Sequence, residues 1–348
     1  MIFGYPIPNN TNNWLHICLY NMINSIHTAI DSGATPSDWP DIIPSAHRSD
    51  LLGYTGIRDR LDNYKKAIIK LSSKTRNKIL KCLYEENQIE SLLSCASTCD
   101  KITDLPKIIQ EPIIDLFSFS FKKLTDLGIR DIHYKCIHDK LENDVCPFCG
   151  CEFFSAPGAP REDLDHYLAR KIYPFAAANL FNLPPMGMVC NEKYKLAQNL
   201  LEDVSGNRRV AFYPYKEHST EISLLNSTPL PSSGILFEWK IDFIPDSPEC
   251  QTWDDVFKIK ERYRRDILDK KSLIWLNLFK KWHKEKFHLE SISSSLVVKS
   301  LETYLDSMPY YDLTGRAFLC PLFFRALLHN CANNDTRLLL FMCDLLNQ

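Results

Sequence analysis

The stretch Cys146–Lys195 constrains the fold more than any other part of the chain. It begins with Cys-Pro-Phe-Cys-Gly, in which two residues separate two thiols, and it continues through a Pro/Gly-rich loop to Asp165-His166. It ends with Cys-Asn-Glu-Lys-Tyr-Lys. Side chains suited to metal binding and proton transfer recur at meaningful spacing only here, so we interpret the remainder of the chain as scaffold.

The composition limits the class of protein. The chain has 348 residues, of which 45% are apolar and 24% charged, enough for a sizeable core divided over two or three structural units. A formal net charge of −2 means that any binding to nucleic acid depends on local basic patches.

The sequence also indicates a compartment. The opening residues, MIFGYPIPNNTNN, lack the basic and apolar regions of a signal peptide, and no apolar run approaches the ~18–20 residues of a membrane helix. Thirteen scattered cysteines, an odd number, do not indicate a secreted disulfide framework. We therefore expect a cytoplasmic protein whose clustered cysteines bind metal.

Apolar spacing predicts an N-terminal helical domain over residues 1–130. A helix is expected over 14–30, two amphipathic helices within 61–97, and a third from 106 to about 127, with Gly128 placed to end it. The basic residues of this domain are better interpreted as a solvated helix face than as a phosphate-binding surface.

Residues 131–215 change character and are predicted to form a separate small domain with short strands. They are rich in His, Cys, Asn and Pro, and a strand is expected over 208–213. The C-terminal region, 216–348, is predicted to contain short strands followed by helices. A loop is expected over 226–234 and an alternating strand over 235–243.

A long helix is predicted over residues 253–287. Its apolar stripe includes Ile274 and Leu278, which are therefore expected on the buried face. The other faces carry eleven basic against six acidic side chains, which makes this the most basic element of the chain and a possible track for DNA phosphates.

Cys146 and Cys149 have the separation that lets a tight turn direct two thiolates at one tetrahedral zinc ion. Cys190 is the expected third ligand. The fourth stays open among three nearby residues: Cys151, Cys136 and His138. The alternative is that these cysteines are buried thiols without a metal.

Asp165 and His166 carry the sharpest chemical signal. Histidine is a natural general base near neutral pH, and a neighbouring carboxylate can hold a divalent cation. Successive side chains of a strand point to opposite faces, so both can act on one site only at an irregular strand end or bulge. Asn182 and Asn191 follow at short distances along the chain.

Asn191 opens a segment that is predicted to begin a helix. A carboxylate and an amide oxygen are hard ligands suited to Mg²⁺ or Mn²⁺. Lys193 and Lys195 lie on the same short helix and are expected to supply positive charge to a nucleic-acid backbone.

The order Cys-x-x-Cys, Asp-Leu-Asp-His, Asn-Leu and Cys-Asn followed by lysines resembles the zinc-knuckled branch of the HNH endonucleases. The resemblance covers about 50–70 residues and implies a ββα-metal core in which a hairpin and a helix hold one catalytic cation. The family often has a second Cys-x-x-Cys motif that ends at the position of Cys190. This chain departs from that pattern, because Gly187 stands where the first cysteine of the motif would be.

Carried over residue by residue, the resemblance makes His166 the general base that activates water. It assigns Asp165 and Asn191 to the catalytic metal. It makes Asn182 the residue that orients the His166 ring, with Asn179, which is also followed by leucine, as the weaker candidate for that role.

The resemblance implies a metal-dependent endonuclease that hydrolyses phosphodiester bonds in DNA. Its fold would be α+β, mainly α, with a small ββα-metal HNH core between two helical regions. HNH modules with long helical flanks resemble effectors of bacterial anti-phage defence, in which an ATPase often controls the nuclease. No G-x-x-x-x-G-K-[ST] loop occurs here, so that ATPase would be a separate protein. The alternatives are an RNA-cleaving toxin of the same fold and a non-catalytic, zinc-stabilised binding module.

Overall fold

The computed structural model describes residues 1–159, 163–232, 235–288, 290–308 and 315–347. It is 58% helix and 6% strand, which confirms the expectation of a mainly helical α+β protein. The chain forms two compact units. The N-terminal unit contains Gly4–Glu142 and Phe154–Glu217, and the C-terminal unit contains Met1–Phe3, Asn143–Phe153 and His218–Gln348.

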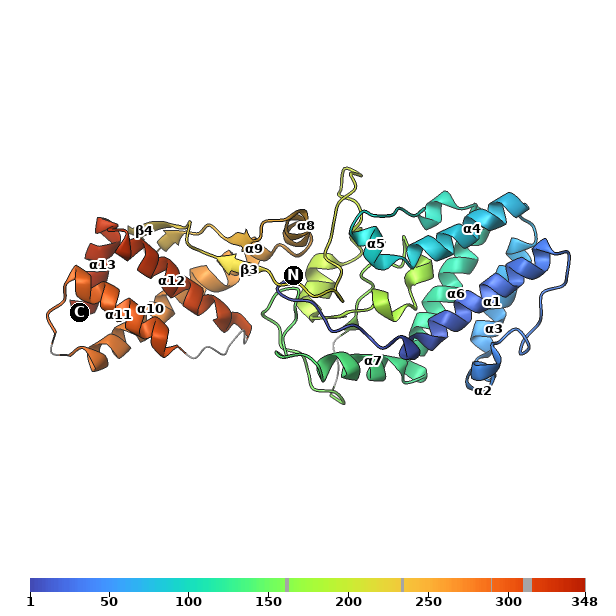
Figure 1. The fold of residues 1–348 in the computed structure, drawn as a ribbon, viewed down its shortest axis with the longest axis horizontal. Coiled ribbons are helices and arrows are strands. Elements are labelled where there is room, and N and C mark those ends of the chain that lie inside the picture. Colours follow the sequence, from blue (N-terminus) through green and yellow to red (C-terminus); the bar gives the residue numbers. More distant parts are fainter. Residues whose placement is uncertain (160–162, 233–234, 289, 309–314, 348) are drawn as a thin grey trace. The chain divides into compact units, whose positions relative to one another are not determined.

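The N-terminal unit is a helical bundle with short strands and turns inserted against it (Figure 1). Its α-helices are α1 (Trp14–Asp31), α2 (Arg48–Leu51), α3 (Thr55–Ile68), α4 (Ser73–Glu86), α5 (Ile89–Leu93), α6 (Lys107–Asp126) and α7 (Ile129–His138). Its 3-10 helices are η1 (Asn10–Asn13), η2 (Ser45–His47), η3 (Ile102–Asp104), η4 (Pro174–Ala176) and η5 (Leu180–Asn182). Its other elements are the strands β1 (Asp163–Leu164) and β2 (Pro185–Met186) and the π-helix η6 (Cys190–Lys195).

Local sequence signals explain where these helices begin and end. The hydroxyl of Ser72 accepts a hydrogen bond from the backbone N–H of Thr75, at 3.3 Å, and caps α4. Gly128 adopts φ = +67° between α6 and α7, a conformation that costs little without a Cβ. The predicted helices over 14–30 and 106–127 are thereby confirmed as α1 and α6.

One hydrophobic core joins the N-terminal helices to the segment that carries Asp165 and His166. It contains buried residues of α1, α3, α4 and α6 together with Leu164, Phe175 and Leu180. The ring of Phe117 on α6 meets the ring of Phe175 edge-on, with the ring centroids 5.2 Å apart. The helices therefore fix the position of the segment that was singled out by sequence.

Buried histidines make the stability of this unit dependent on pH. Burial lowers the pKa of His16, His27 and His133 from 6.5 to about 4. The unfolded state takes up these protons first, so the contribution to stability is complete above about pH 6.5 and is lost as the pH falls towards 4. We expect a lower unfolding midpoint at about pH 4.5 than at about pH 7, and a smaller difference for His27→Gln. An unfolding midpoint that is the same at both pH values would contradict this assignment.

The C-terminal unit contains two antiparallel strand pairs and a group of helices. Strands β3 (Glu221–Ser223) and β6 (Asp242–Ile244) form one pair, and β4 (Thr228–Ser232) and β5 (Ile235–Glu238) form the other. The helices are α8 (Pro248–Phe257), α9 (Ile259–Arg262), the π-helix η7 (Tyr263–Leu268), α10 (Asp269–Lys286), α11 (Ser294–Ser307), η8 (Gly315–Phe318), α12 (Leu319–Ala332) and α13 (Thr336–Asn347). The helical tail predicted from residue 296 is confirmed.

The predicted helix over 253–287 is wrong in one respect: it is not continuous. Lys258 adopts a left-handed conformation, with φ = +52°, and separates α8 from α9. The π-helix η7 then shifts the register, so that the buried face of α10 contains Leu276 and Phe279. Ile274 and Leu278, which were expected in the core, are 49% and 53% exposed.

Three smaller expectations also differ from the structure. Residues 208–213 do not form a strand, since Arg208 makes only an isolated bridge with Glu202. The expected loop over 226–234 contains β4, and the expected strand over 235–243 divides into β5 and the start of β6. Across the described residues, no helix combines the length and apolar character that a membrane span requires.

Candidate functional site

Asp165 and His166 lie directly after a short strand, as the sequence required. Strands β1 and β2 pair antiparallel, with Leu164 opposite Pro185. The backbone N–H of Asp165 then donates to the carbonyl of Pro184, at 3.2 Å, before the chain leaves the strand. The alternation of side chains ends there, so Asp165 and His166 can both face one pocket.

That pocket has a volume of about 320 Å³ and lies wholly within the N-terminal unit. We call it the His166 pocket; its lining residues are Phe121, Arg130, Leu164, Asp165, His166, Ala169, Arg170, Lys171, Asn191, Leu196 and Ala197. Three of the predicted site residues, Asp165, His166 and Asn191, meet in it. Asn182, Lys193 and Lys195 do not line it.

The ring of His166 is held in a defined orientation. Its Nε2 donates to the backbone carbonyl of Ala177, at 3.1 Å, and its ring lies 4.2 Å from that of Phe121, measured between centroids. A carbonyl oxygen only accepts, so Nε2 carries the proton and the neutral ring has its lone pair on Nδ1. Burial, followed by the charges of Arg170 and Lys195, lowers the pKa of His166 to about 3, which keeps the ring neutral at pH 7.

Asn182 is fully buried and positions the segments around His166. Its side-chain oxygen accepts from the N–H of Leu168, at 2.6 Å. Its side-chain nitrogen donates to the carbonyls of Leu168, at 3.1 Å, and Ala176, at 3.2 Å. Ala176 precedes Ala177, whose carbonyl holds the His166 ring, so the Asn182 contacts lie one residue from that carbonyl.

Asn179 has a different place. Its side-chain oxygen accepts from the side chain of Asn13 and caps η5 by accepting from the N–H of Phe181, both at 3.0 Å. Its nitrogen donates to the side chain of Asn87, at 2.9 Å. These contacts tie η5 to the N-terminal helices, so Asn179 does not take the orienting role.

Lys195 is where the structure corrects the sequence-based expectation most clearly. Its side chain is almost completely buried; its Nζ pairs with Oδ2 of Asp165, at 2.7 Å, and donates to the carbonyl of His166, at 2.7 Å. A nucleic-acid backbone cannot reach it, so the expected phosphate contact is wrong for Lys195. Lys193 on the same π-helix is exposed, so the predicted contact with a nucleic-acid backbone stays a prediction for that residue.

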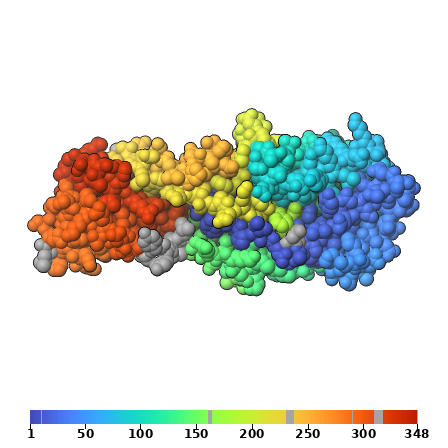
Figure 2. Space-filling view, in the orientation of Figure 1, coloured from blue at the N-terminus to red at the C-terminus, as the bar shows by residue number. Residues whose placement is uncertain are grey.

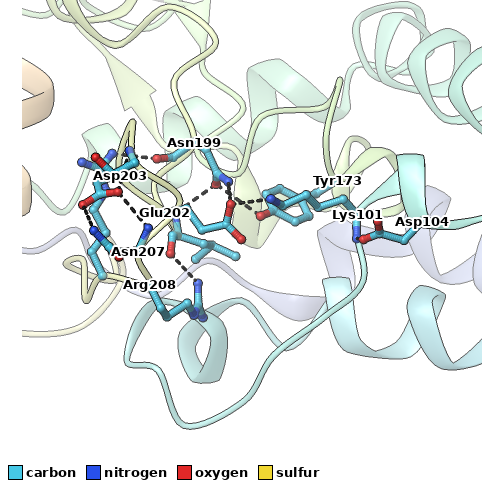
Figure 3. A network of polar contacts seen from close by, with 11 residues as sticks. Lys101, Asp104, Tyr173, Asn199, Glu202, Asp203, Asn207 and Arg208 are labelled. Atoms are coloured by element: carbon cyan, nitrogen blue, oxygen red, sulfur yellow. Dashed lines mark hydrogen bonds and ion pairs between the residues drawn. The ribbon is translucent and has the colours of Figure 1, made fainter.

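A second polar network anchors the chain that follows Lys195. The turn at residues 203–206 protrudes from the surface in yellow-green (Figure 2), and Asp203 of this turn belongs to the network (Figure 3). Glu202 pairs with Lys101, while Asn199 accepts from the hydroxyl of Tyr173, at 3.2 Å. Arg208 donates to the carbonyl of Ser97, at 3.2 Å. The segment after η6 is thus fixed to the chain around Ser97 and Lys101 and to Tyr173.

The cysteine knuckle spans Val145 to Phe153, which form an isolated antiparallel bridge. The N–H groups of Cys149 and Gly150 donate to the carbonyl of Cys146, at 3.1 and 2.7 Å. Gly150 has φ = +64°, the left-handed geometry that a tight turn of this kind requires.

Side chains from helices of the C-terminal unit donate hydrogen bonds to the backbone of the knuckle. The indole of Trp253 donates to the carbonyl of Phe148, and the hydroxyl of Tyr263 donates to that of Cys149, both at 2.8 Å. The side chains of Cys146 and Cys149 are both buried in this turn.

Three residues of the knuckle belong to a group that could hold a metal ion: Cys146, Cys149 and Glu152. Their ligand atoms all lie within 4.8 Å of one another. Thiolate and carboxylate are both ligand types that zinc accepts. Glu152 is not among the three residues left open by the sequence, and Cys190, the expected third ligand, belongs to the N-terminal unit.

Sequence reasoning missed Glu152, Phe121 and Arg130. Glu152 did give a signal, since it follows Cys149 by three residues and a carboxylate is an accepted zinc ligand. Phe121 and Arg130 lie on α6 and α7, far upstream of the motif, and only tertiary packing brings them to His166.

Comparison with protein-family models, curated proteins and solved structures finds no match to this chain.

Proposed function

We propose that this protein is a metal-dependent endonuclease of the HNH type that hydrolyses phosphodiester bonds in DNA, and that it serves as the nuclease of an anti-phage defence system. One observation carries the proposal. His166, anchored through Nε2, lines the same pocket as Asp165, Asn191 and two arginines. A neutral histidine beside hard oxygen ligands and cationic side chains is suited to the hydrolysis of an anionic ester.

In this proposal each residue has a defined task. Nδ1 of His166 takes the proton from the attacking water, while the Ala177 carbonyl keeps the ring in place. Asn182 holds the backbone on either side of that contact and is a positioning residue. Lys195 compensates the charge of Asp165 and fixes its side chain.

The residues present fit a catalytic divalent cation. Mg²⁺ and Mn²⁺ are commonly held by one or two protein oxygen ligands, with waters and substrate phosphate completing the shell. Asp165 offers a carboxylate and Asn191 an amide oxygen at the same pocket. When bound, the ion would stabilise negative charge on the phosphate and the leaving oxygen.

Cleavage of supercoiled plasmid tests the proposal. Purified protein with Mg²⁺ or Mn²⁺ should convert the plasmid to nicked or linear forms, and EDTA should stop the conversion. A parallel assay with labelled RNA separates the alternatives. Cleavage of RNA alone would favour the RNA-cleaving toxin. Nucleic-acid binding without cleavage of either substrate, unchanged in His166→Ala, would favour the non-catalytic module.

We further propose that Cys146, Cys149 and Glu152 of the knuckle hold structural zinc. Glu152 also lies near Arg262, with Oε2 and Nη2 3.9 Å apart, so a cation of the protein offsets part of the negative charge of the ligands. Purified protein should contain about one zinc per chain, and Cys149→Ser should lose most of it, with a lower melting temperature. Cys95→Ser, at an exposed thiol outside the group, is the control. Equal zinc content in both variants would contradict the assignment.

A further inference from the structure

Three groups are arranged around the ring of Phe121 in the His166 pocket. The His166 ring lies against it, and the guanidinium carbons of Arg130 and Arg170 lie 5.3 and 5.8 Å from its centroid. Both distances are within the range of cation–π attraction. Phe121 is therefore a common platform that sets the two guanidinium groups beside the histidine.

Basic side chains gather in the pocket although the chain as a whole has a net charge of −2. Arg130, Arg170 and Lys171 line it, and the acidic side chain among the described lining residues is Asp165. That carboxylate is already compensated by Lys195. No ion pair to Arg170 occurs in the part of the chain that the structure describes. Arg170 therefore brings a positive charge to a concave site, which focuses the field and concentrates anions even on a chain of net charge −2.

We propose that Arg130 and Arg170 form a phosphate clamp that holds the nucleic-acid backbone against His166, with Phe121 as its platform. This inference rests on the proposed endonuclease function and assigns its substrate contacts. A guanidinium presents a planar fork of donors that matches two phosphate oxygens, whereas a lysine offers a single point charge. The clamp takes one residue from α7 and its platform from α6, so the N-terminal helices contribute directly to the site.

The clamp predicts specific changes in DNA binding. A short fluorescein-labelled duplex is titrated with the full-length protein in Ca²⁺, with fluorescence anisotropy as the readout and the salt concentration varied. Arg130→Gln and Arg170→Gln should each weaken binding by about tenfold and lower the slope of log Kd against log salt by about 0.9, the value for one phosphate contact. Arg58→Gln is the control, because Arg58 pairs with Asp59 outside the pocket.

Charge-conserving variants separate a phosphate contact from a fold defect. Arg130→Lys and Arg170→Lys should keep the salt slope of the wild type while binding more weakly, because the charge remains and the fork is lost. Gln variants with the affinity and slope of Arg58→Gln would overturn the clamp, and so would a wild type that binds no DNA. Arginine-dependent binding without cleavage under any metal would leave the clamp standing and overturn the endonuclease. Cleavage with arginine-independent binding would do the reverse.

Discussion

Replacing His166 by alanine is expected to lower the rate of DNA cleavage by about 10²- to 10⁴-fold, the usual contribution of a general base. The reason is local. The Nε2 contact with Ala177 commits one ring nitrogen to the scaffold and leaves proton transfer to Nδ1, and no other histidine is found among the described residues that line the pocket. The measurement is the initial rate of plasmid nicking with Mg²⁺ and with Mn²⁺, at matched protein concentration.

His47→Ala is the matched control for this experiment. His47 stacks on Trp14 and pairs with Asp50, away from the His166 pocket, so its removal should leave the rate unchanged. Equal rates for His166→Ala and His47→Ala would show that His166 takes no part in the chemistry.

The cleavage rate of Asn182→Ala is expected to lie between those of the wild type and His166→Ala. The base remains in this variant, but the backbone contact that supports it is weakened.

Much of the architecture follows from local sequence. The helix boundaries at Ser72 and Gly128 are capping signals, and a strand that ends before Asp165 was required for Asp165 and His166 to share a site. These features depend on residues close together in sequence, where propensity and periodicity are informative.

Other features could not be predicted from the sequence, because they depend on irregularities of the backbone. Periodicity assumes a uniform 3.6 residues per turn, and the π-helix η7 breaks that assumption, which moves Ile274 and Leu278 from the predicted core to the surface. The same cause affects Lys195. In the π-helix η6 the N–H of Leu196 bonds to the carbonyl of Asn191, five residues back, at 2.9 Å. A short irregular helix gives no signal of which of its lysines turns inwards.

The remaining omissions are tertiary. Phe121 and Arg130 belong to the helical region, which the sequence assigned to scaffold, and nothing in their spacing relates them to His166. The shared core explains the result, because α6 packs on the segment that follows His166 and carries Phe121 to the pocket. The N-terminal helices therefore both support the His166 pocket and supply part of its lining.

Lys195→Met is expected to destabilise the N-terminal unit by about 3–5 kcal/mol, the cost of removing one partner of a buried ion pair. Asp165 is only 7% exposed and Lys195 is fully buried, so the substitution removes a cation that is paired with a buried carboxylate. The His166 carbonyl would lose its donor as well. Guanidinium unfolding followed by circular dichroism measures the loss.

Two variants make this prediction specific to the pair. Lys193→Met removes an exposed lysine from the same π-helix and should change the unfolding free energy by less than about 0.5 kcal/mol. Adding Asp165→Asn to Lys195→Met removes the buried negative charge that lost its lysine and should recover part of the lost stability, a coupling that independent sites would not show. If Lys195→Met unfolds like Lys193→Met, the lysine does not support Asp165, and the carboxylate must be held by other contacts.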